Sequence, residues 1–237
     1  MATLYVVATP IGNMEDITHR AVRVLGEVTV LACEDSRMTR KLFARYEIPL
    51  PRTIIAYHEH NEVHAGKRLL GLLDDGVDVA LCSDGGCPGI SDPGYRILDA
   101  CHEAGHSIGV LPGASAVHTA LLASGLSTSS YLFKGFPPRK SGQRQRFLEP
   151  EKDLPHTLIF FESPYRVGAF LKDARVVLGN RIAAVCIELT KRFERVHRAP
   201  LDELIPIFAE GKVKGEVSIV IAGNHPKFYA PSDNDEE

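Results

Sequence analysis

The feature that most constrains the fold of this chain is a regular alternation of short β-branched runs with longer amphipathic ones. Strand-like runs lie at residues 4–9, 29–33, 53–59, 77–83 and 107–113. Each is followed by a segment of helical periodicity, at residues 16–28, 36–47, 62–76, 94–105 and 114–125. Five such units in a row predict a mostly parallel sheet with helices on both faces. Asp16 is expected to cap the first helix.

The pattern restarts after a small, polar stretch at residues 125–130. Further strands are expected at residues 131–136, 157–163, 181–190 and 216–223, with helices at 164–179 and 200–211. The sequence therefore predicts an α/β protein with two α/β domains. The N-terminal domain is expected to cover residues 1–126, the C-terminal domain 127–225, and an acidic tail 226–237.

Composition favours a cytoplasmic enzyme and gives no sign of a membrane protein. No apolar run among the 237 residues approaches the roughly 20 needed to cross a bilayer, and the N-terminus lacks the pattern of a signal peptide. The five cysteines form no CxxC pair, so neither a disulfide framework nor a zinc ribbon is indicated. The formal net charge is −3, but residues 137–146 and 191–198 are locally basic.

Three loops rich in small residues follow predicted strands of the first domain. Residues 83–94, SDGGCPGISDPG, hold four glycines and two prolines, and the shorter loops are TPIGN at 9–13 and PGASA at 112–116. Such loops let backbone groups approach a ligand closely, at the strand ends where α/β sheets bind ligands. Neither GxxxxGK[ST] nor GxGxxG occurs, which disfavours a nucleotide bound through its phosphates. We therefore expect a small-molecule site.

Eight motifs in order resemble those of a known family. They are LYVVATPIGNMEDITHRAVRVL (4–25), ACEDSRMTRKL (32–42), SDGGCPGISDPG (83–94), LPGASA (111–116), GFPPRK (135–140), FFESPYRV (160–167), ELTKRFE (188–194) and KGEVSIVIAG (214–223). This set resembles the ribosomal RNA small-subunit methyltransferase I family of the tetrapyrrole methylase superfamily. Many relatives have SDAGTP where this chain has SDGGCP, so Gly85 and Cys87 are departures.

The resemblance implies two domains of the tetrapyrrole methylase type with S-adenosylmethionine (SAM) in the cleft between them. It implies a homodimer that methylates the ribose 2′-oxygen of a cytidine in the decoding region of 16S ribosomal RNA, within the small ribosomal subunit. Transferred position by position, the resemblance assigns SAM contacts to Pro10, Asp84, Cys87, Ser115 and Ala116 in the first domain and to Phe161 and Thr190 in the second. No metal is expected.

Methyl transfer to a hydroxyl needs a proton acceptor, and carboxylates at predicted strand ends are the candidates. Glu188, Lys191 and Glu162 are the expected catalytic residues, while Glu34, Asp35 and Arg37 follow another strand and could meet the substrate. Ion pairing or helix capping would explain the same residues without catalysis. RNA phosphates are expected to contact Arg37 and a mobile basic loop that carries Arg139, Lys140, Arg144 and Arg146.

Other functions fit parts of the pattern. The methyl acceptor could be a tetrapyrrole or a modified protein residue, since a polycarboxylate ring would also attract arginines. A metal-dependent hydrolase could use His58, His60, Asp84 and Asp92, although HxHxxxH at residues 58–64 lacks an acidic partner motif. A non-catalytic RNA-binding protein of the same fold is the third alternative.

Overall fold

The computed structural model describes residues 2–209 and 213–228. It divides into two compact units, Met1–Ser115 and Ala116–Glu237. Of the expected acidic tail, Pro226–Phe228 form a short 3-10 turn (η3), and residues 229–237 lie outside the described part. No helix in the described ranges has both the length and the apolar character that a membrane crossing requires.

The first unit is built on a five-stranded sheet in the order β3-β2-β4-β1-β5. Its strands are β1 (Thr3–Val7), β2 (Val30–Cys33), β3 (Thr53–Ala56), β4 (Val79–Cys82) and β5 (Ser107–Leu111). All neighbouring strands run parallel, which confirms the predicted sheet. β2 and β4 are buried along their whole length, as expected for strands covered on both faces.

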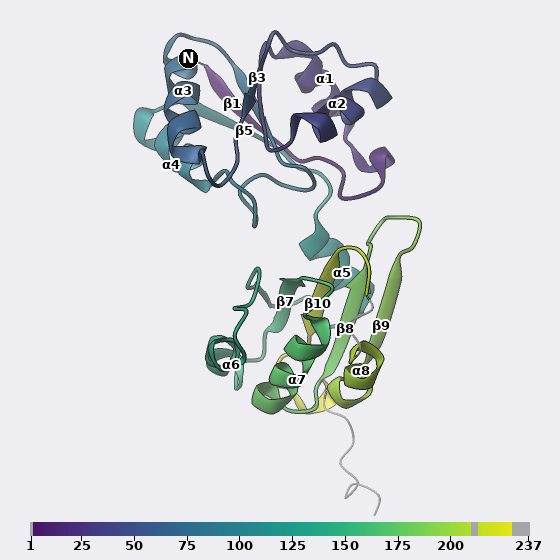
Figure 1. Ribbon diagram of the computed structural model, residues 1–237. Helices are drawn as coiled ribbons and strands as arrows, with labels where there is room; N and C mark the ends of the chain where they lie inside the picture. Colours follow the sequence, from purple (N-terminus) through teal and green to yellow (C-terminus); the bar gives the residue numbers. More distant parts are fainter. Residues whose placement is uncertain (1, 210–212, 229–237) are drawn as a thin grey trace, which may run out of the picture. The chain divides into compact units, whose positions relative to one another are not determined.

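Helices cover both faces of this sheet (Figure 1). α1 (His19–Glu27) and α2 (Ser36–Arg45) bury Leu25 and Phe43 on one face, and α3 (Glu62–Asp74) and α4 (Tyr95–Ala104) bury Leu69 and Ile97 on the other. A 3-10 turn, η1 (Met14–Asp16), precedes α1. Thr18, not Asp16, caps α1, because its hydroxyl accepts a hydrogen bond from the amide of Ala21 at 3.1 Å.

The second unit contains a mixed sheet in the order β6-β7-β10-β8-β9. Its strands are β6 (Tyr131–Phe133), β7 (Thr157–Glu162), β8 (Ile182–Ile187), β9 (Arg195–Pro200) and β10 (Val217–Ile221). β6 and β7 are parallel, and every other neighbouring pair is antiparallel. The carboxyl ends of β6, β7 and β8 therefore meet at one edge of the sheet.

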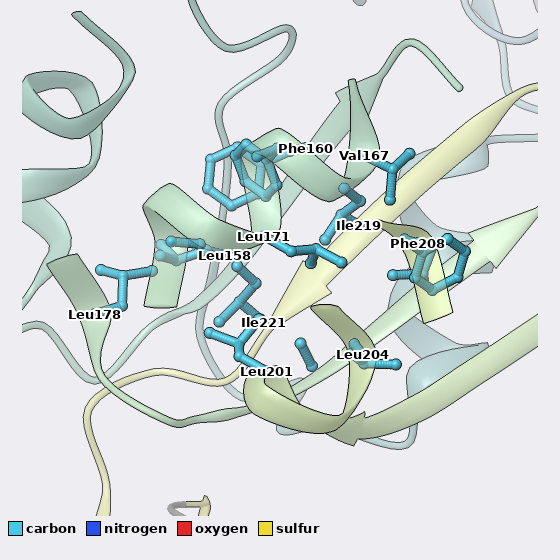
Figure 2. Packing of buried hydrophobic residues seen from close by; sticks show 14 of the residues in the cluster. Leu158, Phe160, Val167, Leu171, Leu178, Leu201, Leu204, Phe208, Ile219 and Ile221 are labelled. Carbon is cyan, nitrogen blue, oxygen red and sulfur yellow. The ribbon is translucent and has the colours of Figure 1, made fainter. Parts of the chain in front are cut away.

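Two faces of this second sheet are covered by different helices. Figure 2 shows the core that α7 (Val167–Leu178) and α8 (Leu201–Phe208) form with β7 and β10, around Phe160 and Ile219. α5 (Ala116–Ser124) covers the other face through Val117 and Leu121. The sequence placed this helix in the first domain, but it packs on the second sheet, so the division falls after Ser115 and not near residue 126.

Two elements of the second unit were not expected from the sequence. α6 (Ser141–Leu148), followed by a 3-10 turn, η2 (Glu149–Glu151), replaces the expected mobile basic loop. β9 is an edge strand paired with β8, and its exposed positions carry Arg195, Val196 and Arg198. Both segments are too polar to show the apolar periodicity by which the other elements are recognised.

Candidate functional site

Three loops meet at the carboxyl edge of the first sheet, because β4, β1 and β5 are neighbouring strands. The loop after β1 is joined to the loop after β4 by a pair of backbone hydrogen bonds between Thr9 and Gly86, of 2.9 and 3.0 Å. The Thr9 hydroxyl also donates to the carbonyl of Ser83 at 3.2 Å. The loops that the sequence predicted to form a ligand site therefore lie side by side.

Small residues are needed where these loops approach one another most closely, and glycine is favoured at Gly113 and Gly86. A Cβ on Gly113 would lie 2.9 Å from the Cβ of Ala8, and one on Gly85 would lie 3.3 Å from the carbonyl oxygen of Pro10. Gly86 has a φ of +86°, which residues with a side chain rarely adopt. Because these residues are small, backbone groups of the loops can approach a bound small molecule closely.

The cofactor residues that the sequence predicts in the first domain all lie on these loops or next to them. Asp84 is exposed and accepts a hydrogen bond from the amide of Asp35 at 3.0 Å. Cys87 places its sulfur 3.8 Å from the carbonyl oxygen of Ala114, so its side chain links the second loop to the third. Burial raises the pKa of the Cys87 thiol. Ser115 ends the third loop, and Ala116 begins α5.

Next to these loops, the ends of β2 and β3 border an open hollow of about 470 Å³. Its lining includes Glu34, Asp35, Arg37 and Arg40. Burial raises the pKa of Glu34, and the negative charge of Asp84 raises it further. Arg37 forms a bidentate ion pair with Asp35, with Nε–Oδ1 at 3.0 Å and Nη2–Oδ2 at 2.6 Å. These hydrogen bonds lower the pKa of Asp35 to about 2.

The other cofactor candidates lie at the edge of the second sheet where β7 and β8 end. Phe161 on β7 packs against Phe133 and Phe136, with ring centroids 4.8 and 5.7 Å apart. Thr190 follows β8 with a φ of 65°, and its amide donates to the carboxylate of Glu194 at 2.5 Å. Their contacts with SAM stay predictions.

Glu188 and Lys191 form a compact charged turn after β8. One carboxylate oxygen of Glu188 accepts from the amide of Glu216 at 2.9 Å and from the Lys191 ammonium at 3.0 Å. The hydrogen bond from the Glu216 amide and the Lys191 charge lower the pKa of Glu188, although partial burial opposes them. A carboxylate held in this way is a weaker proton acceptor than a free one, and its hydrogen bonds also stabilise the turn. The catalytic roles of Glu188 and Lys191 stay predictions.

Glu162 differs from the other two candidates because its side chain is fully buried. It points to the face covered by α7, where it accepts from the Arg166 guanidinium (Nε) at 2.6 Å and from the Ser163 amide at 2.7 Å. Burial raises the pKa of Glu162, and the bonds from Ser163 and Arg166 offset this only in part. These contacts hold Glu162 inside the second unit, and its catalytic role stays a prediction.

The basic residues after β6 are also not equivalent. Arg144 is only 3% exposed. Its Nε donates to Asp173 at 2.7 Å, and its Nη1 donates to the carbonyl of Arg139 at 3.1 Å. The expectation that Arg144 contacts RNA is therefore wrong, since its guanidinium is used inside the protein. Arg139, Lys140 and Arg146 are exposed, and Arg37 has an exposed side chain despite its pairing with Asp35.

The histidine-rich segment gives no support to the metal-dependent alternative. The rings of His58 and His60 lie edge to face, with centroids 6.1 Å apart. Among residues 2–209 and 213–228, no group of three or more His, Cys, Asp and Glu side chains is placed to hold a metal ion.

Comparison with known families gives one match over most of the chain. Residues 3–205 match the model of the Tetrapyrrole (Corrin/Porphyrin) Methylases. A protein of Halalkalibacterium halodurans named ribosomal RNA small subunit methyltransferase I is 46% identical over 95% of this chain and 77% of its own length. Further relatives with the same name, among them one of Bacillus subtilis at 40% identity, cover similar shares.

Solved structures share the fold at much lower identity. The methyltransferase CobJ has a TM-score of 0.71 at 17% identity, covering 98% of this chain and all of its own. A uroporphyrin-III C-methyltransferase of Thermus thermophilus, solved in complex with S-adenyl homocysteine, has a TM-score of 0.62 at 21% identity and covers 93% of this chain and 97% of its own. These likenesses concern the fold alone.

Proposed function

The chain belongs to the tetrapyrrole methylase family and is a SAM-dependent methyltransferase, and from this premise we propose that it methylates ribosomal RNA of the small subunit. We assign the methyl group to the 2′-oxygen of a cytidine in the decoding region. The observation that carries the proposal of ribosomal RNA as substrate is the 46% identity, over 95% of the chain, to a relative named ribosomal RNA small subunit methyltransferase I. The structures of CobJ and of the uroporphyrin-III C-methyltransferase share only the fold, at 17% and 21% identity.

The loops at the carboxyl edge of the first sheet fit the cofactor. Close packing at Gly85 and Gly113 leaves backbone N–H and C=O groups as the main ligand-binding groups, which suits the polar edges of an adenosine and an amino acid. We propose that Pro10, Asp84 and Ser115 border this site, and that the Cys87 side chain holds two of its loops together. When bound, SAM supplies a methyl group already activated on a sulfonium.

The protein then has two tasks: it holds the ribose hydroxyl in line with the methyl group, and it accepts the hydroxyl proton. In the transfer, the sulfur–methyl bond breaks as the oxygen–methyl bond forms, and the proton passes to a base. We propose Glu34 as that base. It lines the hollow beside Asp84, and burial and the Asp84 charge raise its pKa, which makes it more basic than an ordinary glutamate. Glu188, whose carboxylate is held by hydrogen bonds, and the buried Glu162 are less suited to accept the proton.

The test is transfer of labelled methyl from SAM to three acceptors: small ribosomal subunits that lack the modification, the naked RNA and a porphyrinogen. Wild-type protein is compared with Asp84→Ala and with Asp75→Ala, an exposed carboxylate at the end of α3. We expect label at a ribose of the subunit, lost with Asp84→Ala and kept with Asp75→Ala. Label on the porphyrinogen alone would overturn the RNA assignment.

The proposal extends to the setting of the reaction. The relatives' printed names point to the RNA of the small subunit as partner. That the protein acts as a homodimer in the cytoplasm is a further prediction, which sedimentation of the purified protein and fractionation of cells would test.

A further inference from the structure

Three large aromatic side chains are exposed after consecutive strand ends of the second sheet. Phe136 follows β6 and is 58% exposed, Tyr165 follows β7 and is 82% exposed, and Phe193 follows β8 and is 68% exposed. Phe136 packs against Phe161, but more than half of its surface stays exposed, and the proposed chemistry of the first unit uses none of the three rings. Burial in the core explains only a small part of these side chains, so their exposed faces call for another explanation.

The strand pairing brings the three rings to one edge. Glu162 at the end of β7 pairs with Val217 on β10, which pairs in turn with Ile187 at the end of β8. On the other side of β7, the amide of Phe161 donates to the carbonyl of Gly135 at 3.0 Å, which places the exit of β6 beside it. Neighbouring strands are spaced roughly 4.8 Å apart, so the carboxyl ends of β6, β7 and β8 lie along a row about as long as a few stacked nucleotides.

Charges of both signs lie along this row: Glu194 and Glu216 are exposed carboxylates, and cations lie beside them. Lys191 is neutralised by Glu188 and Glu216, and Arg166 by Glu162. Arg139, Lys140 and Arg192 form no ion pair with the described residues. The Arg192 guanidinium lies over the ring of Phe193, 5.5 Å from its centroid. Exposed rings next to unpaired cations are the combination that binds single-stranded nucleic acid: bases stack on the rings and phosphates meet the cations.

We infer that Phe136, Tyr165 and Phe193 form a stacking surface for unpaired nucleotides of the RNA substrate. We call these three residues the aromatic row. The inference rests on the proposed function for the identity of the RNA, but it adds a site and a mode of recognition. A nucleotide flanking the modified one stacks on each accessible ring, and Arg139, Lys140 and Arg192 contact the backbone between them. Paired RNA binds poorly because its base faces are covered by their neighbours.

The sequence offers a direct test because the chain contains no tryptophan. Tyr165→Trp and Phe193→Trp each introduce a single fluorophore into the row. Tyr131→Trp is the matched control, since Tyr131 is 40% exposed at the start of β6, at the opposite edge of the same sheet. The probe is an oligocytidylate of about ten nucleotides, within the usual range of site sizes, and the comparison is duplex RNA of equal length.

We expect the single strand to quench the emission of Tyr165→Trp and Phe193→Trp, while Tyr131→Trp and the duplex titrations change little. Tyr165→Ala and Phe193→Ala should each weaken binding of the oligonucleotide about tenfold. Phe136→Leu, which keeps an apolar side chain against Phe161, should weaken it without loss of thermal stability. Equal quenching at residue 131, no quenching in the row, or wild-type affinity of the alanine variants would overturn the inference.

Methyl transfer to small subunits separates this inference from the proposed function. If the wild type transfers methyl groups and the row variants bind and react as the wild type does, the stacking surface is wrong and the activity stands. If the row binds the single strand as expected but no methyl group reaches ribosomal RNA, the surface stands and the proposed substrate is wrong.

Discussion

At the scale of the residue, the best-defined chemical feature is the environment of Glu34. Its folded-state pKa is raised by burial first and by the charge of Asp84 second. As a base it works only when ionised, so the rate of methyl transfer should rise with pH through this raised pKa, above the ordinary value of 4.5. Glu34→Gln removes the base and should lower kcat about a hundredfold or more, with little effect on SAM binding.

Glu103→Gln serves as control for the Glu34 variant, because Glu103 is exposed on α4. The measurement is the pH profile of kcat for the wild type and both variants, with SAM affinity determined by calorimetry. A Glu34→Gln profile that keeps the wild-type inflection and rate would assign the proton to another group.

Single residues also mark the limits of prediction from sequence. The glycines of the three loops at the carboxyl edge of the first sheet were predictable because their role is conformational and local, as at Gly86 with its φ of +86°. The role of Arg144 was not, because its partner Asp173 lies 29 residues away and only the fold brings the two together. The expected cap Asp16 is wrong because Thr18, two residues later, can cap equally well, and only the observed start of α1 shows which side chain does so.

At the scale of the element, α6 depends on the buried pair of Arg144 and Asp173. Asp173 accepts from the Arg144 Nε and from Ser141 and Gln145, each at 2.7 Å, and these bonds outweigh the effect of burial to lower its pKa. Arg144→Met leaves this carboxylate without its cation in the interior. We expect the free energy of unfolding of the second unit to fall by about 3–5 kcal/mol.

Urea unfolding followed by circular dichroism measures this loss, with Arg139→Met as control. Arg139 is exposed, so its replacement should change the free energy of unfolding by less than about 0.5 kcal/mol. The lowered pKa of Asp173 also fixes the pH dependence. The ionised Asp173 carboxylate contributes fully to the free energy of unfolding when the pH is above the ordinary carboxyl pKa of 3.8. This contribution is lost as the pH falls through the lower pKa that Asp173 has in the folded state. Equal free energies of unfolding for Arg144→Met and Arg139→Met at neutral pH would show that α6 does not depend on the buried ion pair.

The elements of the first unit could be predicted almost completely, and those of the second only in part. β2 and β4 are buried on both faces, so apolar content alone marks them. β9 lies at a sheet edge and α6 carries a largely polar sequence, so neither shows a periodic apolar pattern. α5 was recognised as a helix but assigned to the wrong unit, because amphipathic periodicity does not say which sheet a helix covers.

At the scale of the whole molecule, the charge of the chain limits how RNA can be bound. The formal net charge is −3, so attraction to a polyanion has to come from local groups of cations and not from the overall charge. Arg139 and Lys140 are two exposed cations at the edge where the aromatic row lies, and they differ from Lys191 in having no acidic partner among the described residues. RNA affinity should therefore depend on salt through a few identifiable phosphate contacts.

The corresponding prediction concerns the slope of log K against log salt concentration for binding to single-stranded RNA. Each cation that meets a phosphate contributes about 0.7 to the slope, so Arg139→Ala and Lys140→Ala should each reduce it by about that amount. Lys67→Ala is the control, because Lys67 is exposed on α3 of the first unit. Affinities measured by fluorescence polarisation over a series of salt concentrations give the three slopes. Lys67→Ala could instead reduce the slope as much as Arg139→Ala and Lys140→Ala do. RNA would then bind through cations all over the surface. In that case neither the basic residues after β6 nor the aromatic row beside them would define where the RNA lies.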